Sequence, residues 1–280
     1  MLTLVISCPD TIGIVAKVSH FIASNNGSVM ESNHHTDIEE CWFYMRNVIN
    51  TSKMNISQAQ FEQQFAAIAE EFSMQWHVRD MNKKQKVVLF ASHTSHCIAD
   101  ILHRWHSSEL DCDIAAVISN HRNLESLVRF YQIPFHHITM TADTKADAFA
   151  NMDKLLNKYQ ADTIVLARFM QIIPEAMCHK YHGRLINIHH SFLPSFIGAN
   201  PYQKAHDRGV KLIGATCHYV TADLDEGPII EQEVIRVNHS CDKHDLIRLG
   251  KDVEQMALAR GLRYHLQDRV IIRGNKTIVF

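Results

Sequence analysis

The stretch KVVLFAS at residues 86–92 is a nearly continuous run of apolar residues, and it decides the class of fold. Segments with helical spacing separate it from three further runs of the same kind, namely 113–120 (DIAAVISN), 162–169 (DTIVLARF) and 184–189 (RLINIH). Strands that are apolar throughout and alternate with helices are typical of a parallel sheet covered on both faces. The sequence therefore predicts an α/β domain with a mostly parallel sheet.

The first 80 residues follow a different pattern. Residues 2–7 (LTLVIS) are typical of a strand, and apolar residues at helical spacing follow from about 12 to 25. Ser57 and Gln60 have the spacing of a capping box at the start of a second helix. With three more strands, this gives the order βαββαβ; the strands are expected near 28–36, 41–49 and 74–79.

A polar stretch without periodicity, DMNKKQ at 80–85, separates the two patterns. We therefore expect a small α+β domain over residues 1–80, a linker over 81–85 and the larger α/β domain over 86–280. A chain of 280 residues with 46% hydrophobic residues has enough apolar material for two cores.

Composition excludes several classes of function. The formal net charge is −2 with no basic tail, so nucleic acid is not expected as a partner. No stretch reaches the roughly 18 apolar residues of a membrane span, and no signal peptide is recognisable at the N-terminus, so no membrane association is expected. The seven cysteines are scattered without a CxxC pair, which favours reduced thiols in a cytoplasmic protein. The 20 histidines lack metal-site spacing, so we expect no metal.

Polar residues gather where two buried strands end. The strand at 184–189 brings Asn187, His189 and His190 to the carboxyl edge of the sheet, ahead of a loop at 191–200. The next strand contains His218 and leads into the loop TADLDEGP at 221–228. In open α/β sheets ligands bind at this edge, so these two loops are the best candidates for a site.

These two segments resemble the catalytic signature of folate-dependent formyltransferases. The shared pattern is Asn-x-His, Ser-x-Leu-Pro, a distant His and Asp-x-Gly-Pro-Ile, and all four parts occur in INIHHSFLPSFIGANPYQKA (186–205) and IGATCHYVTADLDEGPII (213–230). The resemblance spans roughly residues 85–280. It implies a Rossmann-like formyltransferase domain that takes a formylated folate as substrate and needs neither a cofactor nor a metal.

The resemblance implies that Asn187, His189 and Asp225 are catalytic. The chemistry suits these residue types, because an amide donor stabilises the oxyanion formed when a formyl group is attacked. A histidine protonates the poor arylamine leaving group, and a carboxylate orients that histidine or accepts a proton. Each such group typically contributes about two to four orders of magnitude in rate.

A further set of residues is expected to bind the substrate. The segment RFMQI at 168–172 resembles the folate-binding loop of the family, which assigns Met170, Gln171 and Ile172 to the pterin ring. A plain strand end with core Met and Ile is the alternative. His190 and His218 are expected to bind substrate or support the site, and packing alone is the alternative for His190.

The segment ASHTSHC at 91–97 bears on the acceptor of the formyl group. Ribonucleotide formyltransferases have a Gly-rich phosphate-binding loop here, whereas this segment has no glycine, which makes close backbone approach to a phosphate harder. It resembles instead the Ser-x-x-x-His-Cys sequence of formyltetrahydrofolate deformylases. Water then becomes the natural nucleophile.

The N-terminal segment CPDTIGIV at 8–15 resembles the signature of ACT domains, which bind amino acids and associate with one another. The resemblance implies an amino-acid effector, glycine or methionine, at Asp10, Gly13 and Ile14, and a homo-oligomer. A helix cap and turn is the alternative for this loop.

Together these features predict hydrolysis of 10-formyltetrahydrofolate to formate and tetrahydrofolate, which would balance one-carbon pools and supply formate for purine synthesis. The partners would be the folate substrate and water. Two alternatives stay open: formyl transfer to an amine acceptor, and a catalytically inert module that binds an amino acid or folate.

Overall fold

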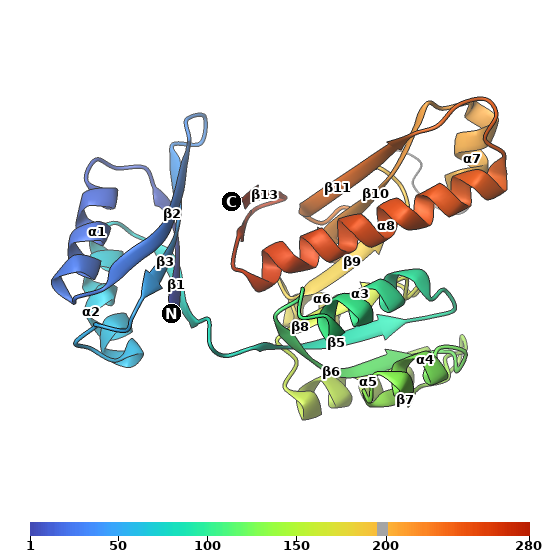
Figure 1. Cartoon of the computed structure of the whole chain (residues 1–280), viewed down its shortest axis with the longest axis horizontal. Coiled ribbons are helices and arrows are strands. Elements are labelled where there is room, and N and C mark those ends of the chain that lie inside the picture. The colour runs from blue at the N-terminus through green and yellow to red at the C-terminus, as the bar shows by residue number, and fades with distance from the viewer. Residues whose placement is uncertain (195–200) are drawn as a thin grey trace. The chain divides into compact units, whose positions relative to one another are not determined.

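The computed structural model describes residues 1–194 and 201–280, so part of the loop expected at 191–200 lies outside the described residues. The chain divides into two compact units, each described by itself below (Figure 1). Unit 1 comprises residues 1–84 together with 267–273 and 278–280, and unit 2 comprises residues 85–266 together with 274–277.

Unit 1 contains its secondary structure in the predicted order βαββαβ. The elements are β1 (Leu2–Pro9), α1 (Ile14–Ser24), β2 (Ser28–Asp37), β3 (Trp42–Asn50), α2 (Gln58–Glu71) and β4 (Gln75–Asp80). The four strands form an antiparallel sheet in the order β2-β3-β1-β4. The predicted capping box is present, because the Ser57 side chain accepts from the Gln60 amide and the Gln60 side chain accepts from the Ser57 amide.

The core of unit 1 lies between this sheet and its two helices. Alternate residues of β1 and β3 face the helices, since successive side chains of a strand point to opposite faces. Phe21 of α1 meets Phe61 and Phe65 of α2, with ring centroids 5.0 and 5.4 Å apart. These aromatic contacts join the two helices over the sheet.

The C-terminal residues correct the predicted domain boundary. We expected residues 86–280 to form one domain, but residues 267–273 and 278–280 belong to unit 1. In β12 (Val270–Arg273), Ile271 packs against Val5 and Tyr44, on the sheet face that the helices leave uncovered. The Arg46 guanidinium also donates to the Gln267 carbonyl oxygen, at 2.8 and 3.1 Å. The second face of this sheet is apolar in part and is shielded from water by the C-terminal residues. Their own sequence does not indicate this long-range packing, which is why the predicted boundary was wrong.

Unit 2 is built on a seven-stranded sheet in the order β11-β10-β9-β8-β5-β6-β7. Neighbouring strands from β9 to β7 are parallel, and β10 and β11 complete the sheet in antiparallel pairing, which confirms the prediction of a mostly parallel α/β sheet. The strands are β5 (Gln85–Ala91), β6 (Cys112–Ser119), β7 (Phe135–His137), β8 (Thr163–Ala167), β9 (Leu185–His189), β10 (Leu212–Tyr219) and β11 (Ile229–Arg236).

Helices flank this sheet, as Figure 1 shows. They are α3 (His96–His106), α4 (Glu125–Phe130), α5 (Lys145–Tyr159), α6 (Glu175–Lys180), α7 (Pro201–Arg208) and α8 (Lys243–Leu266). The long helix α8 packs on β9, β10 and β11 and contacts α3 and α7. A side chain at Gly261 would clash with the Cys217 sulfur, so this glycine allows the close approach of α8 to β10. No helix in the described part of the chain is both long and apolar enough to cross a bilayer.

The strand order of unit 2 reverses at β5. The chain runs outward from β5 to β6 and β7, then returns to place β8 and β9 on the other side of β5. The carboxyl ends of β5, β8 and β9 meet at this switch point, where open α/β sheets bind ligands.

Replacement of Ile271 by alanine tests the role of the C-terminal strand. The Ile271 side chain is 7% exposed, so Ile271→Ala should lower the free energy of unfolding of unit 1 by about 2–4 kcal/mol. Hydrogen exchange should accelerate in β1 and β3 and stay unchanged in β5 and β8. The control Val279→Ala removes a side chain that is 39% exposed and should change little. Equal acceleration in both units would contradict this assignment.

Candidate active site in unit 2

The pairing of β9 with β10 brings the predicted polar residues together. Asn187 lies opposite His218 in this antiparallel pair, and His189 lies opposite Thr216. Residues two apart on a strand share a face, and directly paired residues do too. Asn187, His189 and His218 therefore project from one face of the sheet.

The loop after β10 brings Asp225 to these residues. Asp225 has φ +58°, a left-handed conformation that Asp tolerates better than most residues. A Cβ at Gly227 would clash with the backbone carbonyl oxygen of Tyr219, so the glycine lets the loop fold tightly onto the end of β10. The loop closes with a hydrogen bond from the Tyr219 amide to the Pro228 carbonyl, at 2.9 Å. In this position Asp225 Oδ2 lies 3.2 Å from His189 Nδ1.

Asp225 is held as a carboxylate that orients His189. Burial tends to raise the pKa of Asp225, but the hydrogen bond from His189 and the nearby histidines outweigh it, and the pKa is lowered from its ordinary value. Nδ1–H of His189 donates to this carboxylate, which leaves Nε2 as the second functional atom of the ring. Nε2 is buried and has no hydrogen-bond partner among the described residues. The pair has the arrangement in which a carboxylate prepares a histidine for proton transfer.

His218 orients the amide of Asn187. His218 Nδ1 donates to the Tyr219 carbonyl oxygen at 2.9 Å, so its Nε2 accepts from Asn187 Nδ2 at 3.2 Å. Burial lowers the pKa of His218, which favours the neutral ring that this acceptor role requires. One amide hydrogen of Asn187 is thereby fixed and the other is left for a ligand. His218 thus supports the amide.

A cavity of about 630 Å³ lies over these residues, within the usual range for small-molecule sites. Asn187, His189, His218 and Asp225 all line it, together with the predicted substrate-binding residues, which are Met170, Gln171, Ile172 and His190. His190 stacks on His189 with ring centroids 5.1 Å apart. Burial, with the positive charge of Arg168, lowers the pKa of His190 to about 4, so its ring is neutral near pH 7.

The segment after β8 forms one wall of the cavity. Phe169 is buried against Phe90, with centroids 5.1 Å apart, and its carbonyl oxygen contacts the Ser92 hydroxyl. This anchor leaves Met170 and Ile172 61% and 58% exposed, so the alternative of plain core packing does not apply to them. An exposed apolar wall is suited to a flat ring.

The cavity also has four charged or polar residues to which the sequence assigned no role. Glu254 of α8 is 1% exposed and contacts His96 Nε2 at 2.7 Å, the Tyr202 hydroxyl at 2.6 Å and Arg168 Nε at 3.4 Å. His96 and Arg168 stand in segments singled out above, whereas no motif marks Glu254. The sequence separation of 158 residues between His96 and Glu254 explains why local reasoning did not find this cluster.

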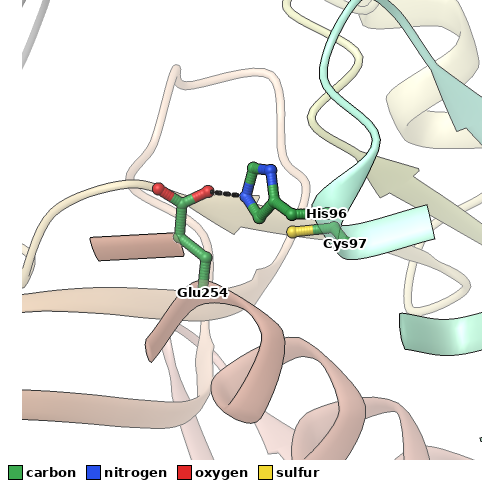
Figure 2. Close-up of side chains that lie close together, drawn as sticks. All are labelled: His96, Cys97 and Glu254. Carbon is green, nitrogen blue, oxygen red and sulfur yellow. Dashed lines mark hydrogen bonds and ion pairs between the residues drawn. The ribbon is translucent and has the colours of Figure 1, made fainter. Parts of the chain in front are cut away.

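Two residues of this cluster, His96 and Glu254, also lie close to Cys97, and the three have ligand atoms near enough to one another for a metal ion. Figure 2 shows His96, Cys97 and Glu254, whose possible ligand atoms lie within 4.8 Å of one another. Burial and the Glu254 charge, however, raise the pKa of Cys97 well above its ordinary value, and a metal requires the thiolate. Glu254 is already paired with Arg168. Glu254 is thus engaged by His96, Tyr202 and Arg168 in one hydrogen-bonded cluster.

The predicted effector residues lie in unit 1. Gly13 precedes α1 with φ +100°, a conformation that favours glycine, and Asp10 is exposed. The Ile14 side chain is 2% exposed and packs in the core of unit 1, so only its backbone is available to a ligand.

The pH dependence of stability tests the buried cluster. Burial tends to raise the pKa of Glu254. The combined effect of His96, Arg168 and Tyr202 is larger and in the opposite direction, so the pKa lies below its ordinary value of 4.5. The unfolded state then binds more protons, so the stabilisation is complete above about pH 5.5 and is lost as pH falls through the folded-state pKa. In denaturant titrations, the stability gap between wild type and Glu254→Gln should narrow below that pH. The exposed control Glu175→Gln should show no such trend; a constant gap for Glu254→Gln would contradict the assignment.

Comparisons with known proteins identify the family of the chain. The family model described as "Formyl transferase" matches residues 85–262. The formyltetrahydrofolate deformylase of Bacillus subtilis (strain 168) is 44% identical over 278 residues, which cover 99% of this chain and 93% of that protein. The crystal structure of a formyltetrahydrofolate deformylase from Pseudomonas syringae pv. tomato has a TM-score of 0.98 at 56% identity, covering 100% and 94% of the two chains.

A structural relative with a different name matches only part of the chain. The glycinamide ribonucleotide transformylase 1 of Symbiobacterium toebii has a TM-score of 0.66 at 26% identity and covers 73% of this chain, although 97% of its own. The likeness to the deformylases extends through both units. The chain therefore belongs to the formyltetrahydrofolate deformylase family.

Proposed function

We propose that the chain hydrolyses 10-formyltetrahydrofolate to formate and tetrahydrofolate. The observation that carries this proposal is the arrangement of Asp225, His189, Asn187 and His218 at one cavity. It unites a proton-transfer pair and an oriented amide donor, which are the groups that hydrolysis of a formamide requires. The names of the relatives in the family support this substrate and reaction.

The cavity suggests how the folate binds. The exposed side chains of Met170 and Ile172 offer an apolar surface for the pterin ring, and Gln171 adds polar groups beside them. The formyl group then lies toward His189 and Asn187, on the sheet side of the same cavity.

In the first chemical step, water attacks the formyl carbon while His189 Nε2 takes its proton. Asp225 stabilises the imidazolium that forms, because its carboxylate contacts Nδ1 at 3.2 Å. Negative charge moves to the formyl oxygen, where the free Nδ2 hydrogen of Asn187 is the donor. His189 then gives the proton to the folate nitrogen, the C–N bond breaks to leave tetrahydrofolate and formic acid, and the acid releases its proton to become formate.

The alternative, transfer to a phosphorylated amine, is not supported by the segment at 91–97, where a phosphate-binding loop would lie. The segment 91–97 has no glycine, and α3 begins within it at His96. His96 is committed to Glu254 at 2.7 Å, so it is not free for a phosphate. Water as the acceptor is consistent with this arrangement.

For unit 1 we propose an amino-acid-binding role of the ACT type and a homo-oligomeric assembly. The βαββαβ order and the exposed loop around Asp10 and Gly13 support an ACT-like reading. Glycine or methionine would be a sensible effector, because both are close to one-carbon metabolism. Control by such an effector would let a cytoplasmic enzyme balance one-carbon pools and supply formate for purine synthesis.

Loss of the Asp225 carboxylate tests the reaction. Asp225→Asn keeps the side-chain shape but removes the charge that stabilises the His189 imidazolium, so turnover should fall by about three to four orders of magnitude. Formate and tetrahydrofolate are assayed together, without any amine, and should appear in equal amounts with wild type. The matched control Asp113→Asn changes an exposed carboxylate of β6 and should turn over normally. Turnover by wild type only after addition of glycinamide ribonucleotide would show a transferase instead.

Replacement of Gly227 tests the position of the Asp225 loop. In Gly227→Ala the new Cβ meets the Tyr219 carbonyl, so the loop must shift and Asp225 must leave His189. We expect turnover to fall about a hundredfold, as for a displacement of roughly 1 Å at a reacting group, with an unchanged circular dichroism spectrum. Gly209→Ala also strains a glycine turn, with φ +64°, but has open space around it and should remain active. Equal activity of both variants would rule out a constrained loop.

A further inference from the structure

We propose that Arg168 is the receptor for the formate product, held in place by the buried cluster of Glu254, His96 and Tyr202. This inference rests on the proposed hydrolysis. Arg168 directly follows β8 at the carboxyl edge of the sheet and lines the same cavity as Asn187 and His189.

The position of Arg168 depends on two conformational features that are unfavourable by themselves. Its φ is +60°, in the left-handed region that is unfavourable for arginine. In α8, a side chain at Gly250 would overlap the Tyr202 hydroxyl, and glycine in a helix is itself unfavourable. Tyr202 uses this space to donate to Glu254 at 2.6 Å. Two locally unfavourable choices thus build one buried cluster, which is typical of a functional site.

The guanidinium keeps donors that the cluster does not use. Glu254 lies 3.4 Å from Arg168 Nε but receives its short hydrogen bonds from His96 and Tyr202. Arg168 Nε and Nη1, and also His96 Nδ1, are buried without a hydrogen-bond partner among the described residues. Nε faces Glu254, so the edge that remains for a ligand is formed by Nη1 and Nη2, and such a planar edge matches the two oxygens of a carboxylate.

Cationic side chains other than Arg168 also line the cavity. Lys243 and Lys251 of α8 are exposed and line the cavity. They lie on the same face of the helix as Glu254. Glu254 has a lowered pKa and is therefore ionised, it lies 3.4 Å from Arg168 Nε, and the carboxylates of Asp223 and Asp225 line the same cavity. His190, which stacks on His189, is neutral near pH 7 because its pKa is about 4.

Hydrolysis produces an anion that formyl transfer does not. Water adds to the formyl carbon, the C–N bond breaks, the folate nitrogen keeps one proton, and a second proton is released. The neutral formamide and water thus become a neutral arylamine, formate and a proton. Transfer to an amine would leave the formyl group in another neutral amide. A carboxylate receptor beside the reacting groups is therefore a device that suits a hydrolase.

Product inhibition by sodium formate tests this role. Arg168→Gly removes the guanidinium and also suits the positive φ, so the backbone should not be strained. The formate inhibition constant should rise roughly ten- to a hundredfold, the effect of losing hydrogen bonds to a charged group, while KM for the folate changes less than about threefold. Arg168→Lys should restore part of the formate affinity. Sodium chloride at equal ionic strength controls for salt effects.

Two further measurements keep the test decisive. Gln132→Gly relieves the same φ of +60° at an exposed turn and should leave turnover and formate inhibition unchanged. If Arg168→Gly does not fold, Arg168→Asn replaces it, because Asn also tolerates this conformation. Line broadening of [¹³C]formate measures binding directly, even if wild type shows no hydrolysis and the proposed function fails. Equal formate binding by wild type and the Arg168 variant, or none by wild type, would overturn the inference.

Discussion

The antiparallel pairing of β9 with β10 is the constraint on which the site depends. The other strands around the switch point are parallel, and only β10 runs back beside β9. This reversal places His218 opposite Asn187 and lets the loop after β10 return Asp225 to His189. Because β10 is antiparallel, its end at Tyr219 lies beside Ile186, near the start of β9, and the loop after it must fold back to bring Asp225 to His189. The geometry of the site is thus a consequence of strand direction.

The hydrogen bonds around this pair assign a distinct state to each histidine. His218 is tied to a backbone carbonyl and accepts from Asn187, which requires a neutral ring. His189 Nδ1 faces the Asp225 carboxylate, which fixes the orientation of the ring. His190 is neutral because of burial and a nearby cation. Three histidines in one cavity therefore perform different tasks, since their environments and not their residue type decide protonation.

The buried carboxylate of Glu254 organises the charged and polar side chains around it in the cavity. An ionised group at 1% exposure is stable only with partners, and here it has a histidine, a tyrosine and an arginine. The same partners engage the carboxylate that lies beside Cys97. They also include Arg168, a cationic side chain that lines the cavity.

The sequence by itself determined the class of fold and which residues meet at the candidate site. The buried strands of unit 2 are continuous runs of apolar residues, whereas strands of unit 1 alternate apolar and polar residues. Both patterns follow from the direction of successive side chains along a strand. Asn187, His189 and Asp225 stood in a recognisable motif, so their proximity could be expected before the structure. The capping box of α2 was equally local.

Only the tertiary structure decided the contacts made across long separations. Ile271 packs on the sheet of unit 1, although it is more than 200 residues from Tyr44 along the chain. Glu254 meets His96 and Tyr202 because α8 crosses β9 and β10, and no spacing in its own helix indicates those partners. Side-chain identity sets what a residue can bind, but the free energy of packing the whole chain decides which residues meet. The hydrolytic pair was therefore predictable from the sequence, whereas the cluster behind it was not.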